Sequence, residues 1–164
     1  DAHALDNNIV AMSHPDGMSS LLSGSVECQL TTSPYVYKEA AEEGIHEVEG
    51  LESVWPDGNS FIVMMASTDL YEKNPELYQA VVSALEEAIT WINENKEEAA
   101  EMLCEAEDVD AQTMLEWLND PACVYSTETK GVMDMAEFMS ENDFLENEGP
   151  SSMSDLAFDN VKGN

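Results

Sequence analysis

The chain has 164 residues, enough for one ordinary domain with a hydrophobic core but hardly for two. It carries 35 Asp and Glu residues against five Lys and no Arg, which gives a formal charge of −30 at pH 7. A chain this acidic repels phosphate backbones and anionic lipid headgroups, so nucleic acids and membrane surfaces are excluded as expected partners.

Hydrophobic residues make up 43% of the sequence and fall in patterned segments, which predicts a folded chain and not a disordered acidic tail. No apolar run approaches the roughly 18–20 residues that span a bilayer, so no membrane insertion is expected. The sequence begins at Asp1 without a signal peptide, which we interpret as a mature product or a fragment. The excess of Asp and Glu over Lys is typical either of a protein adapted to high salt or of a secreted protein.

The three cysteines are too few and too scattered for a zinc site or a disulfide framework, and we expect no metal or other cofactor. Cys104 and Cys123 can pair if the protein is exported; otherwise both are free thiols. Cys28 lies inside an apolar segment and is expected in the core.

Short apolar segments alternate with helix-start signals in the first third of the chain. Ser13 is followed by Pro15 and Asp16, and Ser33 is followed by Pro34; both patterns are typical of a capped helix N-terminus. The order predicts β-α-β-α-β and therefore parallel pairing in an α/β sheet. We expect strands over residues 8–12, 26–31 and 45–48, one helix from the Ser13 cap to Gly24, and another over residues 35–43.

A continuous apolar segment, residues 61–66, predicts a further strand that is covered on both faces. From residue 67 onward the apolar spacing is helical. The stripe of the long helix that opens at Asn74-Pro75 recurs every three to four residues and predicts one buried face. Its members are Leu77, Val81, Leu85, Ala88, Ile89 and Ile92. Further helices are expected after caps at Asn95 and Asp110 and around residues 132–139, with a short strand at residues 124–126.

Two strand-to-helix turns, residues 13–17 and 31–35, are the candidate binding elements. In an open parallel sheet, ligands sit beyond the carboxyl ends of the strands, where helix N-termini present free N–H groups. The second turn offers three hydroxyls and the Tyr35 ring, which suits a small anion or a flat ring; plain capping by Ser33 is the alternative. With 35 carboxylates, close acidic pairs arise by chance, and no catalytic signature is present.

Three stretches carry a family resemblance, and they lie between about residues 9 and 158. They are LLSGSVECQLTTSPYVYKEA, SFIVMMASTDLYEKNPELYQAVVSALEEAITWINENKEEAAEML, and DPACVYSTETKGVMDMAEFMSENDFL followed by SMSDLAF. Their order resembles the C-terminal half of nitrate/sulfonate/taurine-type substrate-binding proteins of ABC transporters. The resemblance implies a partial type II periplasmic-binding-protein-like α/β fold. Residues 1–66 would be the later part of the second lobe with its crossing strand, and residues 67–164 a helical segment that packs on an absent first lobe.

The same resemblance implies a non-enzymatic, extracytoplasmic protein, secreted or lipid-anchored, that holds a small organic solute between two lobes for an ABC permease. The implied ligand-binding residues are His14, Asp16, Thr32, Ser33, Tyr35, Trp55 and Asn59. Because the chain has no Arg, a neutral heterocycle stays open beside a sulfonate or nitrate-like anion.

Two other functions are weighed against this one. An acidic secreted interaction or ion-buffering protein would use the charge itself and take up calcium weakly at many sites. A pyrimidine-synthesis-like enzyme of the same fold would need Cys28 or Lys38 as a reactive group in the cleft.

Overall fold

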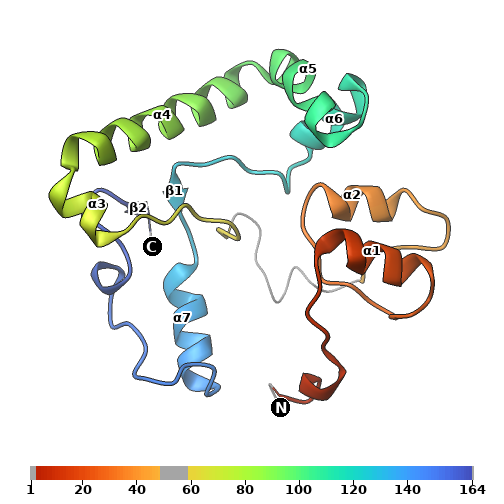
Figure 1. Ribbon diagram of the computed structural model, residues 1–164, viewed down its shortest axis with the longest axis horizontal. Helices are drawn as coiled ribbons and strands as arrows, with labels where there is room; N and C mark the ends of the chain where they lie inside the picture. Colours follow the sequence, from red (N-terminus) through yellow and green to blue (C-terminus); the bar gives the residue numbers. More distant parts are fainter. Residues whose placement is uncertain (1–2, 49–58, 164) are drawn as a thin grey trace. The chain divides into compact units, whose positions relative to one another are not determined.

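The structure is a computed structural model that describes residues 3–48 and 59–163. The chain divides into two compact units, residues 1–51 and 52–164. The described elements of the first unit are the 3-10 helix η1 (Asp6–Asn8) and the helices α1 (His14–Leu22) and α2 (Tyr35–Ala40), shown in Figure 1.

The start of α1 confirms the helix signal in the sequence. Ser13 has an extended backbone, and its hydroxyl accepts the Asp16 backbone N–H at 3.4 Å while donating to the Asp16 carboxylate at 2.6 Å. Pro15 lies in the first turn, and Gly24 turns the chain with a positive φ of 72° after α1 has ended.

The second helix departs from expectation at both ends. Its N-cap is Pro34, with no side-chain cap, so the prediction that Ser33 caps this helix is wrong. α2 ends at Ala40 and not at residue 43. A helix as short as α2 is only marginally stable on its own. Gly44, at which the sequence predicted the helix to end, turns the chain four residues after Ala40.

The predicted α/β sheet of the first third is wrong within the described residues. Residues 8–12, 26–31, 45–48 and 61–66 form no strand, and neither do residues 124–126. A strand is stable only when a neighbour accepts and donates its backbone hydrogen bonds, and these segments have no such ladder in the described part of the chain. Their apolar side chains are correspondingly open, with Leu30 82% and Met65 88% exposed. Cys28 is exposed for the same reason, and its predicted place in the core is wrong.

The second unit is mostly helical, as its apolar spacing predicts. Its described elements are α3 (Thr68–Lys73), α4 (Pro75–Glu94), α5 (Lys96–Glu107), α6 (Ala111–Asn119), β1 (Glu128–Thr129), α7 (Val132–Glu141), the 3-10 helix η3 (Met153–Asp155) and β2 (Lys162–Gly163).

Asp110 caps α6 as predicted: its carboxylate accepts the Thr113 backbone N–H at 2.9 Å. That bond and a second one from the Thr113 hydroxyl lower the pKa of Asp110. Asn95 is the N-cap of α5 but forms no capping bond; its side chain instead donates to the Trp91 carbonyl at 2.8 Å.

The buried core lies between α5 and α6. Its members are Ala99, Ala100, Met114 and Leu118, with Ile92, Leu103, Cys104, Val109, Leu115 and Trp117 packed around them. The small alanines let the two helices approach closely, and Leu118 fills the space at 1% exposure. The Lys96 ammonium donates to the Leu118 carbonyl at 2.6 Å, which satisfies a backbone acceptor at the end of α6.

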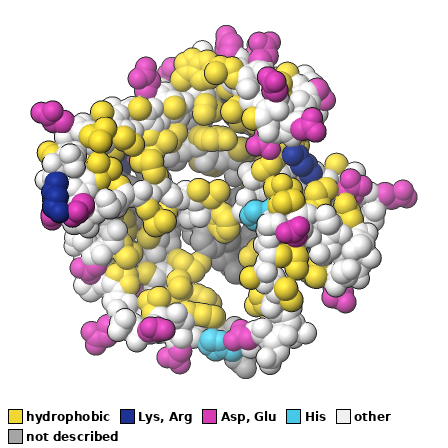
Figure 2. Space-filling view, viewed as in Figure 1, with side chains coloured by type: hydrophobic (Ala, Val, Ile, Leu, Met, Phe, Trp, Pro, Cys, Tyr) yellow, Lys and Arg dark blue, Asp and Glu magenta, His cyan; other side chains and the backbone are white. Residues whose placement is uncertain are grey.

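The apolar stripe of α4 is only partly covered. Tyr78 is buried against the rings of Tyr71 and Phe158, and its hydroxyl donates to Asn160 at 2.8 Å. Leu77, Val81 and Leu85 are exposed, contrary to the buried face that their spacing predicts. Figure 2 shows hydrophobic side chains open to solvent along this helix. The stripe therefore lacks a covering element in the described part of the unit.

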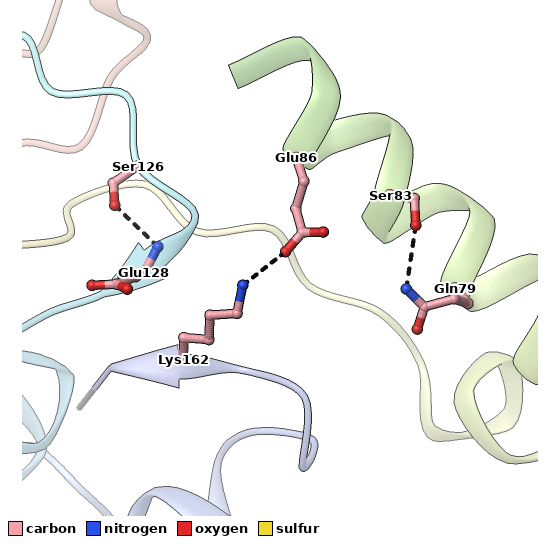
Figure 3. A network of polar contacts seen from close by, with 6 residues as sticks. All are labelled: Gln79, Ser83, Glu86, Ser126, Glu128 and Lys162. Carbon is pink, nitrogen blue, oxygen red and sulfur yellow. Dashed lines mark hydrogen bonds and ion pairs between the residues drawn. The ribbon is translucent and has the colours of Figure 1, made fainter. Parts of the chain in front are cut away.

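The two strands of the described residues, β1 and β2, form a small parallel sheet. Glu128 pairs with Lys162 and Thr129 with Gly163. Gly163 has a φ of 97° and lies directly against the Thr129 carbonyl, where no side chain fits. From β2, the Lys162 ammonium reaches Glu86 of α4 at 3.2 Å, as Figure 3 shows. Both side chains are exposed, so this ion pair adds at most about 1 kcal/mol.

The three cysteines are free thiols in the structure, so the pairing of Cys104 with Cys123 that the sequence left open is not formed in it. The Cys104 thiol donates to the Glu101 carbonyl at 3.4 Å. Burial, with the nearby Asp120 charge, raises the pKa of the Cys123 thiol despite the opposing effect of Lys96.

Candidate functional site

The two turns that the sequence singles out come together in the first unit. The His14 ring, at the start of α1, stacks on the Tyr35 ring at the start of α2, with centroids 5.7 Å apart and planes 16° from parallel. His14 Nδ1 also lies 2.9 Å from the Thr31 hydroxyl. His14 thus links α1, the segment before α2, and α2 itself.

Gln29 packs over the first turn of α1. Its side-chain amide donates to the His14 carbonyl at 3.3 Å and lies against Gly17, which is buried. A Cβ on Gly17 would meet Gln29 Nε2 at 2.5 Å, so only glycine admits the amide in this position. The other end of the amide, Gln29 Oε1, is buried and has no hydrogen-bond partner in the described part of the chain.

Glu39 is the buried charged residue of this unit. It lies one turn after Tyr35 on α2, is 5% exposed, and its Oε1 is buried without a hydrogen-bond partner among the described residues. Burial raises the pKa of Glu39, and the charge of nearby His14 opposes that rise. We name the group His14, Gln29, Tyr35 and Glu39 the His14–Tyr35 cluster.

A cation also borders the cluster. The Lys38 ammonium lies over the Tyr35 ring, 5.6 Å from its centroid. Lys38 is the only Lys or Arg in residues 1–51, so it is the single permanent cation in the sequence of this unit.

The other candidate ligand-binding residues from the sequence lie outside the His14–Tyr35 cluster. Asp16 bonds with Ser13 beside His14, as described above. The Thr32 hydroxyl donates to the Ser33 carbonyl at 3.0 Å, while the exposed Ser33 hydroxyl makes no hydrogen bond within the described residues. Asn59 belongs to the second unit, where its amide lies against Gly131 at the start of α7. Trp55 lies outside the described residues.

Sequence reasoning missed Gln29 and Glu39. Glu39 follows Tyr35 by four positions, so helical spacing alone places it beside a nominated residue. No local signal marks Gln29, because its partner His14 lies 15 positions away. Among the described residues, no group of three His, Cys, Asp or Glu side chains is arranged to hold a metal ion.

Comparison with known proteins assigns the chain to a family. A model of the NMT1-like family matches residues 2–106, and the chain belongs to this family of substrate-binding proteins from the nitrate/sulfonate/bicarbonate group of ABC transporters. Such proteins are typically non-enzymatic and extracytoplasmic. No curated protein and no solved structure gives a significant match. No helix within residues 3–48 and 59–163 is long and apolar enough to cross a membrane.

The close approach of Gln29 to Gly17 supports a first prediction. Gly17→Ala is expected to expel the Gln29 amide, because the amide is the flexible end of its side chain and moves more easily than the α1 backbone. The loss of one hydrogen bond, about 1 kcal/mol, is offset by the better helix propensity of Ala, also about 1 kcal/mol. The variant should therefore remain folded while the Gln29 side-chain amide signals shift in an ¹⁵N–¹H NMR spectrum.

Ser20→Ala is the matched control, since it changes a residue of α1 whose side chain makes no hydrogen bond in the described structure. It should leave the Gln29 signals in place. Unmoved Gln29 signals in Gly17→Ala would show that the amide does not occupy the position described.

Proposed function

We propose that the chain is a solute-binding component of an ABC importer of the nitrate/sulfonate/taurine type. It captures a small organic solute, either a sulfonate or nitrate-like anion or a heterocycle, and presents it to the membrane subunits of a permease outside the cytoplasm. The observation that carries this proposal is the stacking of His14 on Tyr35, because it joins the two nominated turns into one cluster in a chain of this family.

The uncovered apolar surfaces support a two-lobe arrangement of type II periplasmic-binding-protein-like form. In that arrangement residues 1–66 belong to the second lobe with its crossing segment, and residues 67–164 return to pack on the first lobe. The exposed stripe of Leu77, Val81 and Leu85 and the exposed segment 61–65 are the surfaces that such packing would cover. A hydrogen bond from the Ser60 N–H to the Lys130 carbonyl at 2.9 Å places the start of that segment beside the small sheet.

The proposed ligand contacts within the first unit are Tyr35 and Ser33, with His14, Thr32 and Asp16 at the rim. Tyr35 supplies an aromatic ring at the start of α2, and the Ser33 hydroxyl, which is not used for capping, is available to a ligand. The two lobes close on the solute, and the permease recognises the closed form.

The test is a calorimetric titration of the chain with nitrate, taurine and cytosine, each tried separately. Tyr35→Ala combined with Ser33→Ala should weaken the binding of the solute by about 10-fold or more, because truncating an aromatic anchor typically costs over 1 kcal/mol. Tyr37→Ala combined with Ser23→Ala removes the same atoms from the same unit and should leave affinity unchanged. No saturable binding of any probe, or equal binding by both double variants, would contradict the proposal.

A further inference from the structure

Two buried oxygen atoms of the His14–Tyr35 cluster have no hydrogen-bond donor. They are Oε1 of Glu39 and Oε1 of Gln29, and neither finds a partner in the described part of the chain. A buried acceptor left unpaired is costly, and a native structure retains one mainly where a ligand, an ion or water completes it. These two oxygens therefore lack a hydrogen-bond donor among the described residues.

Both oxygens belong to residues that surround His14. The amide nitrogen of Gln29 is fixed on the His14 carbonyl, which holds the opposite oxygen in its buried position. Glu39 lies one helical turn from Tyr35, whose ring stacks on His14. Burial raises the pKa of Glu39, and the charge of nearby His14 opposes that rise. The unpaired acceptors and the aromatic ring therefore form one neighbourhood.

The charges of this neighbourhood oppose an anion. Glu39 is 95% buried, so its ionised carboxylate would face an incoming oxyanion in a poorly solvated position. Lys38, the only Lys or Arg in residues 1–51, already lies over the Tyr35 ring. A planar cation with N–H groups would instead pair with Glu39 and donate to Gln29.

We propose that the His14–Tyr35 cluster binds a small flat cation that carries several N–H donors, of the amidinium or protonated aminoheterocycle class, with Glu39 as its charge partner. This inference rests on the proposed function and names the chemical class of its solute. It is a prediction of selectivity: the cation is bound in preference to a neutral or anionic molecule of the same shape.

The experiment uses three probes of nearly identical shape on the intact chain, namely benzamidinium, benzamide and benzoate. Calorimetric titration at pH 7 should give benzamidinium an affinity at least about 10-fold above benzamide, with no binding of benzoate. Glu39→Gln keeps the size and the acceptor oxygen but removes the charge, and should cost benzamidinium about 10-fold or more. Glu42→Gln, an exposed site that changes the net charge equally, should cost nothing.

The outcomes separate this inference from the proposed function. Binding of benzoate, nitrate or taurine that depends on Tyr35 and Lys38, with no binding of benzamidinium, overturns the cation inference and leaves solute binding intact. Equal loss of benzamidinium affinity in Glu39→Gln and Glu42→Gln overturns it as well, because the attraction would then come from the general acidity of the chain. Absence of binding by every probe overturns both.

Discussion

Leu118→Ala should lower the free energy of unfolding of the second unit by about 2–5 kcal/mol. Leu118 is 1% exposed between α5 and α6 and packs with Ala99, Ala100 and Met114. Its truncation opens a cavity that the two alanines are too small to fill. Since small domains are stable by only about 5–15 kcal/mol, this loss is a large part of the total. Urea unfolding followed by tryptophan fluorescence measures it, because Trp117 packs against the same cluster.

Leu77→Ala is the matched control, as it removes the same atoms from an exposed position on α4. Its effect should stay within about 0.5 kcal/mol. A loss in Leu77→Ala as large as that in Leu118→Ala would contradict the description of α4, because it would mean that the stripe is covered in solution.

Glu39→Gln should stabilise the first unit at neutral pH and flatten the dependence of its stability on pH. The pKa of Glu39 is raised by burial, so the folded state holds its proton more tightly than the unfolded state. Below the unfolded pKa both states are protonated and the group has no effect. As the pH rises through the folded pKa, the native unit must hold a buried charge and loses stability. Glutamine carries no charge at any pH, so the decline should disappear.

Urea titrations at several values between pH 4 and pH 8, read from the amide NMR signals of α1 and α2, follow this unit alone. Glu42→Gln changes an exposed carboxylate and should retain the decline of the parent chain. If Glu39→Gln declines with pH as steeply as the parent, the Glu39 carboxylate is solvated and its described burial is incorrect. Because the same side chain is proposed to hold a cationic solute, the stability gained in this variant would accompany a loss of binding.

The helices could be predicted from the sequence because their signals are local. Ser13 and Asp16 lie within one turn of each other, and so do Asp110 and Thr113, so the caps of α1 and α6 need no distant partner. The apolar spacing of α4 and α7 is equally self-contained. The strands failed because a strand depends on a neighbour in space: residues 61–66 are as apolar as a buried strand, yet no described segment pairs with them along their length.

Part of the candidate site could also be predicted from the sequence. His14 and Tyr35 each follow a helix-start pattern, and their rings stack although the described residues of the first unit form none of the strands from which their proximity was predicted. Helical spacing places Glu39 beside Tyr35, but the sequence could not show that one oxygen each of Gln29 and Glu39 is buried without a partner among the described residues. That property depends on the packing of α1 against α2. The spacing of residues along the chain cannot show it.

A solute that binds at the His14–Tyr35 cluster should shift the amide signals of the residues around it, and chemical-shift mapping of the intact chain detects those shifts. Nitrate, taurine, cytosine and benzamidinium are titrated one at a time into the ¹⁵N-labelled protein. At least one of them should give saturable shifts concentrated at residues 13–17 and 29–39. Shifts concentrated on α4, α5 or α6, or no saturable shift with any of the four, would contradict binding at this cluster.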